Sequence, residues 1–377
     1  MSTELERKLI ERIERDGPIT FRDFMQAALY DAELGYYNTV RLKIGSEGDY
    51  YTSSNVHPAF GAMLARAFVE LWDRSVDPLT LVEFGAGTGK LACDVLSTMR
   101  DEHAVLFERL SYVIIETSPA MRELQRNKLT GFSDRVRWLE REKLERSPIT
   151  GIVFSNEFVD ALPVHRVRRK SRRLEELYVA RAHDEPCLAS AWGEPSTGGL
   201  GEYIERLGAS LREDQIIEIN LDAIEWLAGM ARAIPRGYLV TIDYGDLARH
   251  LWTSDRRSGT LRSFYKHRLI DSPLERVGEQ DITASVNFTA LIEYGRNLGF
   301  ELVSYERQTA FLTRMGLIAR IAAEHSASDT LDDLKERHAV KNLFVPGGIS
   351  DSFRVLIQRN GSNEQAPSRA KTLKRLT

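Results

Sequence analysis

A glycine-rich turn follows a short apolar segment, in the sequence VEFGAGTGK from Val82 to Lys90. Its glycines let the backbone turn tightly and approach a ligand closely, and the start of the following helix adds N–H donors. A dinucleotide-binding turn would carry its third glycine where Lys90 stands, so that fingerprint does not match. The shorter spacing favours a nucleoside with an amino-acid tail, whose ammonium group Glu83 can meet. The residues expected to contact this ligand are Glu83, Gly85, Ala86, Gly87, Thr88 and Gly89.

A second acidic position, Glu116, stands at the carboxyl end of the next apolar segment, in the sequence IIETSP. An acid at the tip of this strand can accept both ribose hydroxyls of a bound nucleoside. Taken alone, Glu116 is better explained as a favourable charge at the start of a helix. The glycine turn one strand earlier favours the ribose contact.

A pair of acids follows the fourth apolar segment, in the sequence FSNEFVDALP from Phe154 to Pro163. Glu157 and Asp160 are three positions apart, so in a helical turn both carboxylates face the same side. Open α/β folds place their ligands at this edge of the sheet. We therefore expect Glu157 and Asp160 to be catalytic and Ser155 and Asn156 to contact the cofactor. The alternative is a pair of solvated capping residues.

The elements that must position these motifs alternate between strands and helices. Predicted strands that are almost wholly apolar imply a parallel sheet covered on both faces, and hence a Rossmann-like α/β fold. The predicted strands are 79–84, 112–116, 136–139, 152–155, 237–244 and 300–306, with a hairpin of 164–168 and 175–180. The predicted helices are 1–15, 20–30, 58–72, 90–100, 120–129 and a helical stretch over 201–233.

The chain divides at changes in this pattern. Residues 1–77 are expected to form a helical and loop-rich segment that contributes to an active-site lid. Residues 78–359 form the catalytic domain, with an insertion at about 164–233 and a loop-rich lid at about 245–290. Residues 360–377 are polar and basic and are expected to be disordered.

Composition limits the classes of protein that remain. The formal charge of −4 gives no general attraction to nucleic acid. Two cysteines without metal-ligand spacing make a metal site unexpected. No apolar stretch is long enough to span a membrane, and the charged start is unlike a signal peptide. We expect a cytoplasmic enzyme that neither inserts into a membrane nor binds a metal.

Beyond these motifs, the chain resembles the MidA family of class I methyltransferases, over nearly its whole length from Phe21 to Val355. The resemblance implies S-adenosyl-L-methionine as cofactor and an arginine of a protein as methyl acceptor. The eukaryotic members are mitochondrial complex I assembly factors, so a respiratory-complex subunit is an implied partner. The stretches that carry the resemblance are ALYD at 28–31, GYY at 35–37, GDY at 48–50, NEF at 156–158, DALP at 160–163, IDYG at 242–245, GTLR at 259–262 and DITA at 281–284.

An arginine acceptor would suit the acidic pair, because the guanidinium donor fork matches a carboxylate bidentately. Glu157 is the favoured clamp. Thr52 and Asp281 are expected in the loops that close over the ligands, and His267 lies in the same region as either a structural residue or a substrate contact. Family members usually carry His and Asp within the segment occupied here by Ser285 to Asn287, which bears on target choice. Two alternatives remain: a small-molecule methyltransferase, and an assembly chaperone that binds the cofactor without turnover.

Overall fold

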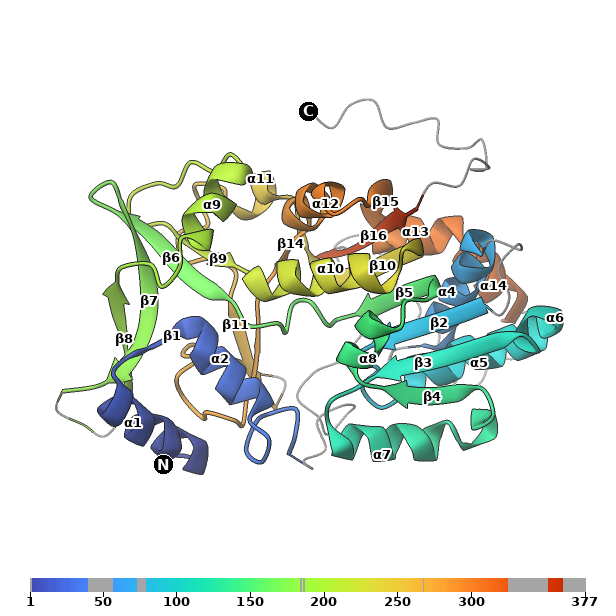
Figure 1. Ribbon diagram of the computed structural model, residues 1–377, viewed down its shortest axis with the longest axis horizontal. Coiled ribbons are helices and arrows are strands. Elements are labelled where there is room, and N and C mark those ends of the chain that lie inside the picture. The colour runs from blue at the N-terminus through green and yellow to red at the C-terminus, as the bar shows by residue number, and fades with distance from the viewer. Residues whose placement is uncertain are drawn as a thin grey trace.

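The structure is a computed structural model, and it describes residues 2–39, 57–72, 79–183, 185, 187–266, 268–324 and 352–361 (Figure 1). The helices are α1 (Glu4–Asp16), α2 (Phe21–Tyr30), α4 (Pro58–Leu71), α5 (Lys90–Glu102), α6 (Ala104–Phe107), α7 (Pro119–Lys128), the 3-10 helix η1 (Thr130–Phe132), α8 (Arg141–Arg146), α9 (Gly199–Arg206), α10 (Leu221–Ala233), α11 (Ala248–Leu251), α12 (Phe288–Asn297), α13 (Gln308–Arg314) and α14 (Leu317–Glu324). The strands are β1 (Ile19–Thr20), β2 (Leu79–Phe84), β3 (Leu110–Ile115), β4 (Val136–Leu139), β5 (Thr150–Asn156), β6 (His165–Lys170), β7 (Arg173–Arg181), β8 (Leu188–Gly193), β9 (Ile216–Ile219), β10 (Arg236–Asp246), β11 (Arg262–Tyr265), β12 (Arg268–Ile270), β13 (Asp281–Thr283), β14 (Val286–Asn287), β15 (Glu301–Arg307) and β16 (Phe353–Asn360).

The largest sheet has eight strands in the order β15-β16-β10-β5-β2-β3-β4, with β14 beside β10. Strands β4, β3, β2, β5 and β10 run parallel, whereas β16 is antiparallel to both β10 and β15. From β2 the chain moves outward through β3 and β4 and then returns to place β5 on the other side of β2. Open α/β sheets bind ligands outside the carboxyl ends of the strands at such a reversal.

The register aligns the carboxyl ends of β2, β3 and β5 at this edge of the sheet, and β10 runs a few residues past them. Phe84 at the end of β2 lies opposite both Ile115 of β3 and Ser155 of β5, and Asn156 lies opposite Ile242 of β10. The residues that follow these strands therefore lie close together, although they are far apart in the sequence.

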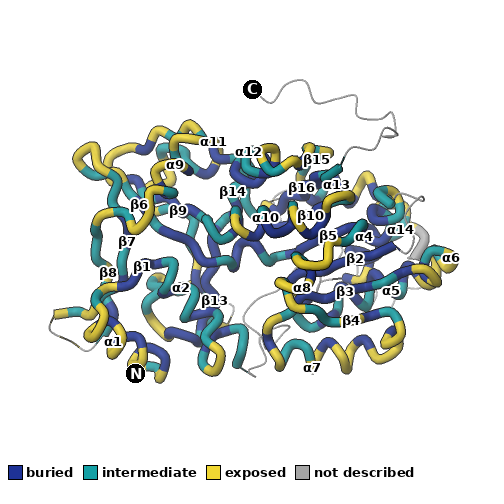
Figure 2. Tube along the Cα trace, viewed as in Figure 1, coloured by how far each residue is buried: buried dark blue, intermediate teal, exposed yellow. Residues whose placement is uncertain are grey.

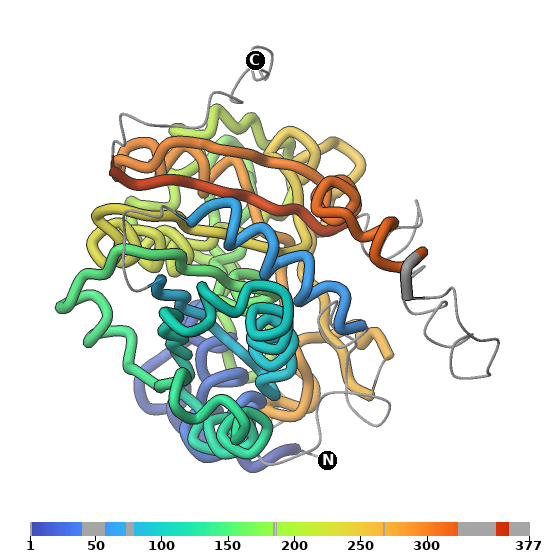
Figure 3. Tube along the Cα trace, turned by 90° about the vertical axis from the view of Figure 1, so that its right-hand side faces the viewer, coloured from blue at the N-terminus to red at the C-terminus, as the bar shows by residue number. Residues whose placement is uncertain are grey.

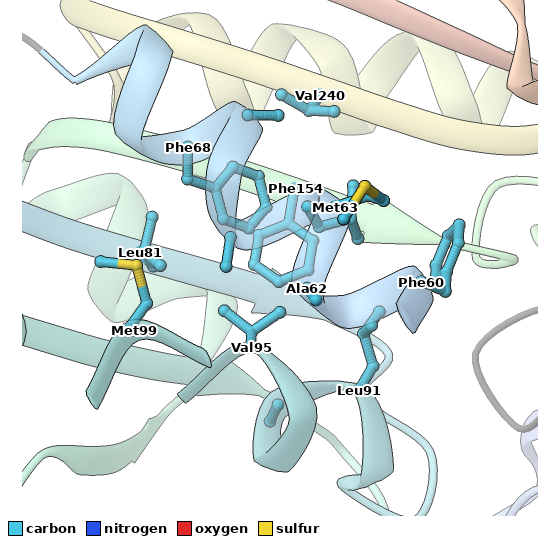
Figure 4. Packing of buried hydrophobic residues seen from close by; sticks show 14 of the residues in the cluster. Phe60, Ala62, Met63, Phe68, Leu81, Leu91, Val95, Met99, Phe154 and Val240 are labelled. Atoms are coloured by element: carbon cyan, nitrogen blue, oxygen red, sulfur yellow. The ribbon is translucent and has the colours of Figure 1, made fainter. Parts of the chain in front are cut away.

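Alternate strand residues pack on opposite faces of the sheet, as the two-residue period of a strand requires. On one face, Phe154 and its neighbours pack against α4 and α5, and the rings of Phe154 and Phe68 lie 4.8 Å apart between centroids (Figure 4). On the other face, Val153 packs with α10 and α12, where Trp226 is fully buried. Both faces are thus covered, which is why the strands are almost wholly apolar.

A second sheet of five strands has the order β1-β7-β6-β9, with β8 beside β7. Helices α1 and α2 pack on one face through residues such as Leu9 and Phe24, while Val167 and Ile217 pack with α9 on the other. Figure 1 shows this sheet at the opposite end of the molecule from β4. Figure 2 shows buried residues along both the five-stranded and the eight-stranded sheet. The segment before α4 therefore folds with the inserted strands.

A third, three-stranded sheet has the order β12-β11-β13 and lies beside α2. Ile282 of β13 and Ala284 belong to the same apolar cluster as Phe24 and Met25 of α2. This packing fixes the position of Asp281, the first residue of β13.

Most predicted elements of the catalytic half are confirmed. The predicted strands 79–84 and 136–139 coincide with β2 and β4, and the hairpin is formed by β6 and β7. The predicted α/β class is also confirmed. The helical prediction over 201–233 is wrong in its centre, where Ile216–Ile219 forms β9 and pairs with β6. A short apolar run of this kind fits either a strand or a helix segment by periodicity alone.

Three other parts of the chain are described more fully by the structure than by the sequence. The segment 245–290, expected to be loop-rich, contains the short strands β11, β12 and β13 between its loops. Residues 353–360 form β16, a central strand that hydrogen-bonds on both sides; Figure 3 shows it beside β15. The expected domain boundary at residue 77 would place α4 and the eight-stranded sheet in different domains, although α4 packs on that sheet. Residues 362–377 of the expected disordered tail lie outside the described residues.

Candidate functional site

The glycine turn adopts the backbone conformation that its sequence requires. Gly85, Gly87 and Gly89 have φ angles of 66°, 52° and 78°, in the left-handed region that favours glycine. The Gly85 N–H donates to the Ile115 carbonyl at 3.3 Å, which joins the turn to β3. A Cβ atom on Gly85 would lie 3.1 Å from the ring of Phe158, so the turn packs tightly against the loop that follows β5.

Glu83 is 2% exposed and accepts a hydrogen bond from the Tyr112 hydroxyl at 2.7 Å. Burial raises the pKa of Glu83 to about 7, the Tyr112 hydrogen bond lowers it, and the charge of Glu116 raises it further. Among the described residues, the groups that shift this pKa include no cation, and a buried carboxylate in such surroundings favours the approach of a positive group. This environment fits the predicted contact with an ammonium group.

Glu116 directly follows β3 and is held by its own loop and by α7. Its Oε1 accepts from the Ser118 N–H at 2.9 Å, and its Oε2 accepts from the Gln125 amide at 3.0 Å. Burial raises the pKa of Glu116, and these hydrogen bonds oppose the rise. The side chain is therefore oriented by groups that favour its charged form.

Sequence reasoning missed Gln125, which is fully buried on α7. Its Nε2 donates to the Gly87 carbonyl at 2.8 Å as well as to Glu116, and its Oε1 accepts from the Trp138 indole at 2.8 Å. A lone glutamine in a polar helix gives no local signal. Only the tertiary arrangement shows that it touches two of the predicted motifs.

The acidic turn, residues 157–160 after β5, is not helical. The Glu157 and Asp160 carboxylates were expected to face the same side on the condition that this turn is helical, and that condition is not met. Glu157 has a φ of 52°, an unusual value for a residue with a side chain. Its N–H donates to the Ile242 carbonyl at 2.9 Å, and the Asn156 amide donates to its Oε1 at 3.1 Å. The left-handed backbone redirects the chain at the end of β5 and leaves Glu157 half-buried.

Asp243 of β10, which sequence reasoning did not select as a site residue, holds this turn. Its Oδ2 accepts from the N–H groups of Phe158, Val159 and Asp160 at 3.2, 2.9 and 3.3 Å. Burial and the charge of Glu157 raise the pKa of Asp243 to about 8, although these backbone donors lower it. The motif IDYG contains Asp243, but its partners could not be read from the sequence.

Asp160 lies among acidic and phenolic groups. It is 4% exposed, and burial followed by the charges of Asp243 and Asp281 raises its pKa well above the ordinary value, while the Tyr244 hydroxyl opposes the rise. The Tyr37 hydroxyl donates to Asp281 Oδ1 at 2.8 Å. The structure thus brings together the predicted residues Asp160 and Asp281.

Three buried oxygens at the end of β5 have no hydrogen-bond partner among the residues that the structure describes: Ser155 Oγ, Asn156 Oδ1 and Asp160 Oδ1. Buried polar atoms in proteins are normally satisfied. Their position beside the glycine turn and Glu116 fits a polar ligand such as a nucleoside with an amino-acid tail.

The remaining predicted residues divide into two groups. Ala86 is buried and Thr88 half-buried in the glycine turn, where both were expected. Thr52 and His267 lie outside the described residues. Asn287, in the segment that departs from the family pattern, caps α12 by accepting from the Ala290 N–H at 3.3 Å. The Ser285 N–H donates to Thr260 Oγ1 at 3.1 Å.

A shallow hollow at the opposite edge of the sheet is lined by residues that include Thr150, Ile152 and Tyr238. These residues lie at the amino ends of the strands, away from every predicted site residue. The candidate site therefore rests on the chemistry at the carboxyl ends. Within the described ranges, no three His, Cys, Asp or Glu side chains are arranged so that they could hold a metal ion, and none of the helices has the length and apolar composition of a membrane span.

Comparisons with known proteins bear on the family and the fold of this chain. A family model described as "Putative S-adenosyl-L-methionine-dependent methyltransferase" matches residues 63–305. The chain is 28% identical to the mitochondrial protein arginine methyltransferase NDUFAF7 of Rattus norvegicus over 346 residues, which cover 85% of this chain and 76% of the rat protein. It is also 28% identical to the Homo sapiens protein of that name, with 85% and 75% covered.

Among solved structures, the chain is similar to a methyl transferase candidate from Burkholderia thailandensis that was crystallised with S-adenosyl-homocysteine. The TM-score is 0.85 at 30% identity, and the match covers 94% of this chain and 92% of that chain. A native crystal structure of a protein from the same organism gives a TM-score of 0.82 at 30% identity, with 94% and 91% covered.

Proposed function

We propose that this chain, which belongs to the MidA family of S-adenosylmethionine-dependent methyltransferases, transfers the methyl group to an arginine side chain of a protein. The observation that carries the proposal is the acidic cluster at the end of β5. Asp160 is buried beside Asp243 and Asp281, and Glu157 is on the same turn. Among the described residues, the charges that shift the pKa of Asp160 are those of Asp243 and Asp281, and the charge that shifts the pKa of Asp243 is that of Glu157, so the neighbours of both are acidic.

Like charges that are buried together favour the binding of a cation, because each carboxylate otherwise resists ionisation. A guanidinium ion is planar and offers several N–H donors, so it can bind two carboxylates at once. The names of the rat and human relatives support the same acceptor, since both are called protein arginine methyltransferases.

In this proposal the cofactor lies across the switch point of the large sheet. Its amino-acid tail would contact Gly85 to Gly89 and Glu83, its ribose would bind Glu116, and Ser155 and Asn156 would line the side facing β5. The bound cofactor supplies an electrophilic methyl group on a sulfonium. The protein contributes alignment and the exclusion of water, which are the main sources of rate in a direct displacement.

On the acceptor side, Glu157 would hold the guanidinium through paired hydrogen bonds, as its carboxylate geometry allows. A nitrogen–carbon bond forms as the sulfur–methyl bond breaks, and the proton released from that nitrogen passes to Asp160. The raised pKa of Asp160 suits it to accept this proton. Asp281 and Tyr37 would form the far wall of the acceptor site.

The partner in this proposal is a protein substrate, and a respiratory-complex subunit is the partner that the family resemblance implies. The sequence leads us to expect a cytoplasmic enzyme, whereas the rat and human relatives are named as mitochondrial.

The test is transfer of a labelled methyl group from S-adenosylmethionine into a lysate of the source cell, followed by sizing of the product and amino-acid analysis. We expect label in protein, recovered as methylarginine. Label in the small-molecule fraction would favour the alternative methyltransferase, and cofactor binding without label would favour the chaperone. Glu157→Gln should bind cofactor normally but transfer about a hundredfold more slowly, because the acceptor loses its charged partner.

The matched control is Glu123→Gln, at an exposed position of α7. It makes the same chemical change away from the acidic turn and should transfer at the wild-type rate. A wild-type rate in Glu157→Gln would remove the carboxylate from the acceptor site and with it the main mechanistic support for arginine.

A further inference from the structure

We infer that Gln125 is a positioning residue that fixes the glycine turn relative to Glu116, so that the two ends of the cofactor are recognised as one unit. The inference rests on the cofactor placement proposed above. Gln125 Nε2 donates to the Gly87 carbonyl at 2.8 Å and to Glu116 Oε2 at 3.0 Å. One amide group therefore bridges the loops that follow β2 and β3.

The orientation of this amide is determined by its surroundings. Both groups that receive the Nε2 hydrogens are acceptors only, while the Trp138 indole N–H donates to Oε1 at 2.8 Å. If the amide were rotated by half a turn, an oxygen would face two acceptors and a nitrogen would face a donor. Only a side chain with two donors on one atom and an acceptor beside it satisfies all three contacts.

Packing holds the bridge in place. Gln125 is fully buried and is the buried residue of α7, a helix whose other residues are partly or wholly exposed. A Cβ atom on Gly89 would lie 3.3 Å from the Gln125 Cα, so the glycine turn and α7 are in close contact. Ser118 caps the start of α7 by accepting from the Met121 N–H at 3.4 Å. The helix that carries Gln125 thus begins at Pro119, three residues after Glu116.

The bridge also acts on the charge of Glu116. The ionisable groups that face it are Glu83 on β2, Arg122 on α7 and Tyr30 on α2. Burial raises the pKa of Glu116, whereas the Gln125 hydrogen bond lowers it. Loss of the amide would leave the carboxylate easier to protonate, and a protonated acid is a poorer acceptor for two ribose hydroxyls.

The experiment compares wild type with Gln125→Met, which keeps the length and burial of the side chain but removes its hydrogen bonds. Binding of S-adenosylhomocysteine is measured by calorimetry between about pH 5 and pH 8, around the range in which a buried carboxyl titrates. We expect about a tenfold to hundredfold weaker binding, the size expected for lost hydrogen bonds to a charged group. We also expect affinity to fall away at a higher pH than in wild type.

The matched control is Gln215→Met. Gln215 is 1% exposed, and its amide donates to the Thr253 carbonyl at 3.1 Å, in a region remote from the glycine turn. This variant should lose thermal stability while binding the ligand with wild-type affinity and pH dependence. It separates the general effect of removing a buried amide from a specific effect on the cofactor site.

A double-mutant cycle with Glu116→Gln completes the test. If Gln125 acts through Glu116, the loss of affinity in the double variant should be smaller than the product of the two single losses. Wild-type affinity in Gln125→Met, an unshifted pH profile or multiplicative losses would overturn the inference and leave the proposed function intact. Failure of the wild-type protein to bind S-adenosylhomocysteine would overturn both.

Discussion

Glu83 offers a test in which stability and ligand binding should change in opposite directions. Burial raises its pKa from 4.5 to about 7 in the folded protein. At about 1.4 kcal/mol for each pH unit, ionising this carboxyl above pH 7 removes about 3 kcal/mol of folding stability. The sign follows from proton binding: the folded state holds the proton more tightly than the unfolded state. The stability is therefore fully present below about pH 4.5 and is lost as the pH rises through about 7.

Glu83→Gln keeps the shape of the side chain and an acceptor for the Tyr112 hydroxyl, but it cannot ionise. The new amide carries N–H donors that need hydrogen-bond partners. This cost offsets about 1–2 kcal/mol of the stability gained by removing the buried charge. We therefore expect the variant to be about 1–2 kcal/mol more stable than wild type at pH 8 and about 1 kcal/mol less stable at pH 5, where the wild-type carboxyl is largely protonated and only the cost of the amide remains. It should also bind S-adenosylmethionine more weakly, because the ammonium group loses its carboxylate.

The assay is urea denaturation of both proteins at about pH 5 and pH 8, with midpoints and slopes compared. Glu176→Gln is the matched control. Glu176 is also fully buried, and although burial opposes the change, hydrogen bonds from His165 and Ser196 lower its pKa. That variant should lose stability at pH 8 and lose less at low pH. If Glu83→Gln is less stable than wild type at pH 8, the reasoning about the buried carboxyl is refuted.

Three further substitutions test the site directly. Gly87→Val should abolish binding of S-adenosylhomocysteine in calorimetry, because a branched residue disfavours a φ of 52° and fills the space beside the ligand, whereas Gly131→Val, with open space around it, should bind normally. Glu116→Ala should weaken binding by about 1–3 kcal/mol without early melting, and normal binding with early melting would make it a structural cap. Asp243→Asn should lower stability by about 1–3 kcal/mol in urea and slow methyl transfer, since an amide donor would face backbone N–H groups; an unchanged protein would argue against its role in holding the acidic turn.

Features whose chemistry is local could be predicted from the sequence. The glycine turn needs a left-handed backbone at Gly85, Gly87 and Gly89, and glycine adopts it readily, so spacing alone located the turn. Strands buried on both faces have near-continuous apolar sequences, which is why β2 and β4 were predicted with correct bounds.

Features that depend on distant partners could not be predicted. Gln125 and Asp243 matter because of the backbone groups that they meet in space, and a buried amide or carboxyl carries no mark of its partners in the sequence. The acidic turn was expected to be helical from the spacing of Glu157 and Asp160. In the structure, Glu157 instead has a left-handed backbone conformation, and its N–H donates to the Ile242 carbonyl of β10.

The position of β16 has a consequence for the order in which the protein folds during synthesis. Arg354 of β16 pairs with Asp246 at the end of β10, 108 positions earlier in the chain, and β16 lies between β10 and β15 in the sheet. Contacts between residues so far apart in the sequence form slowly. Until they form, the exposed strand edge can pair with a wrong segment. Until residues 353–360 leave the ribosome, β10 has one open edge along the register that includes Asp243 and Tyr244. The pairing of the strand that anchors the acidic turn is thus completed only once β16, whose Arg354 lies 108 positions beyond Asp246, has been synthesised, and variants that slow this pairing should lower the yield of folded protein more than its final stability.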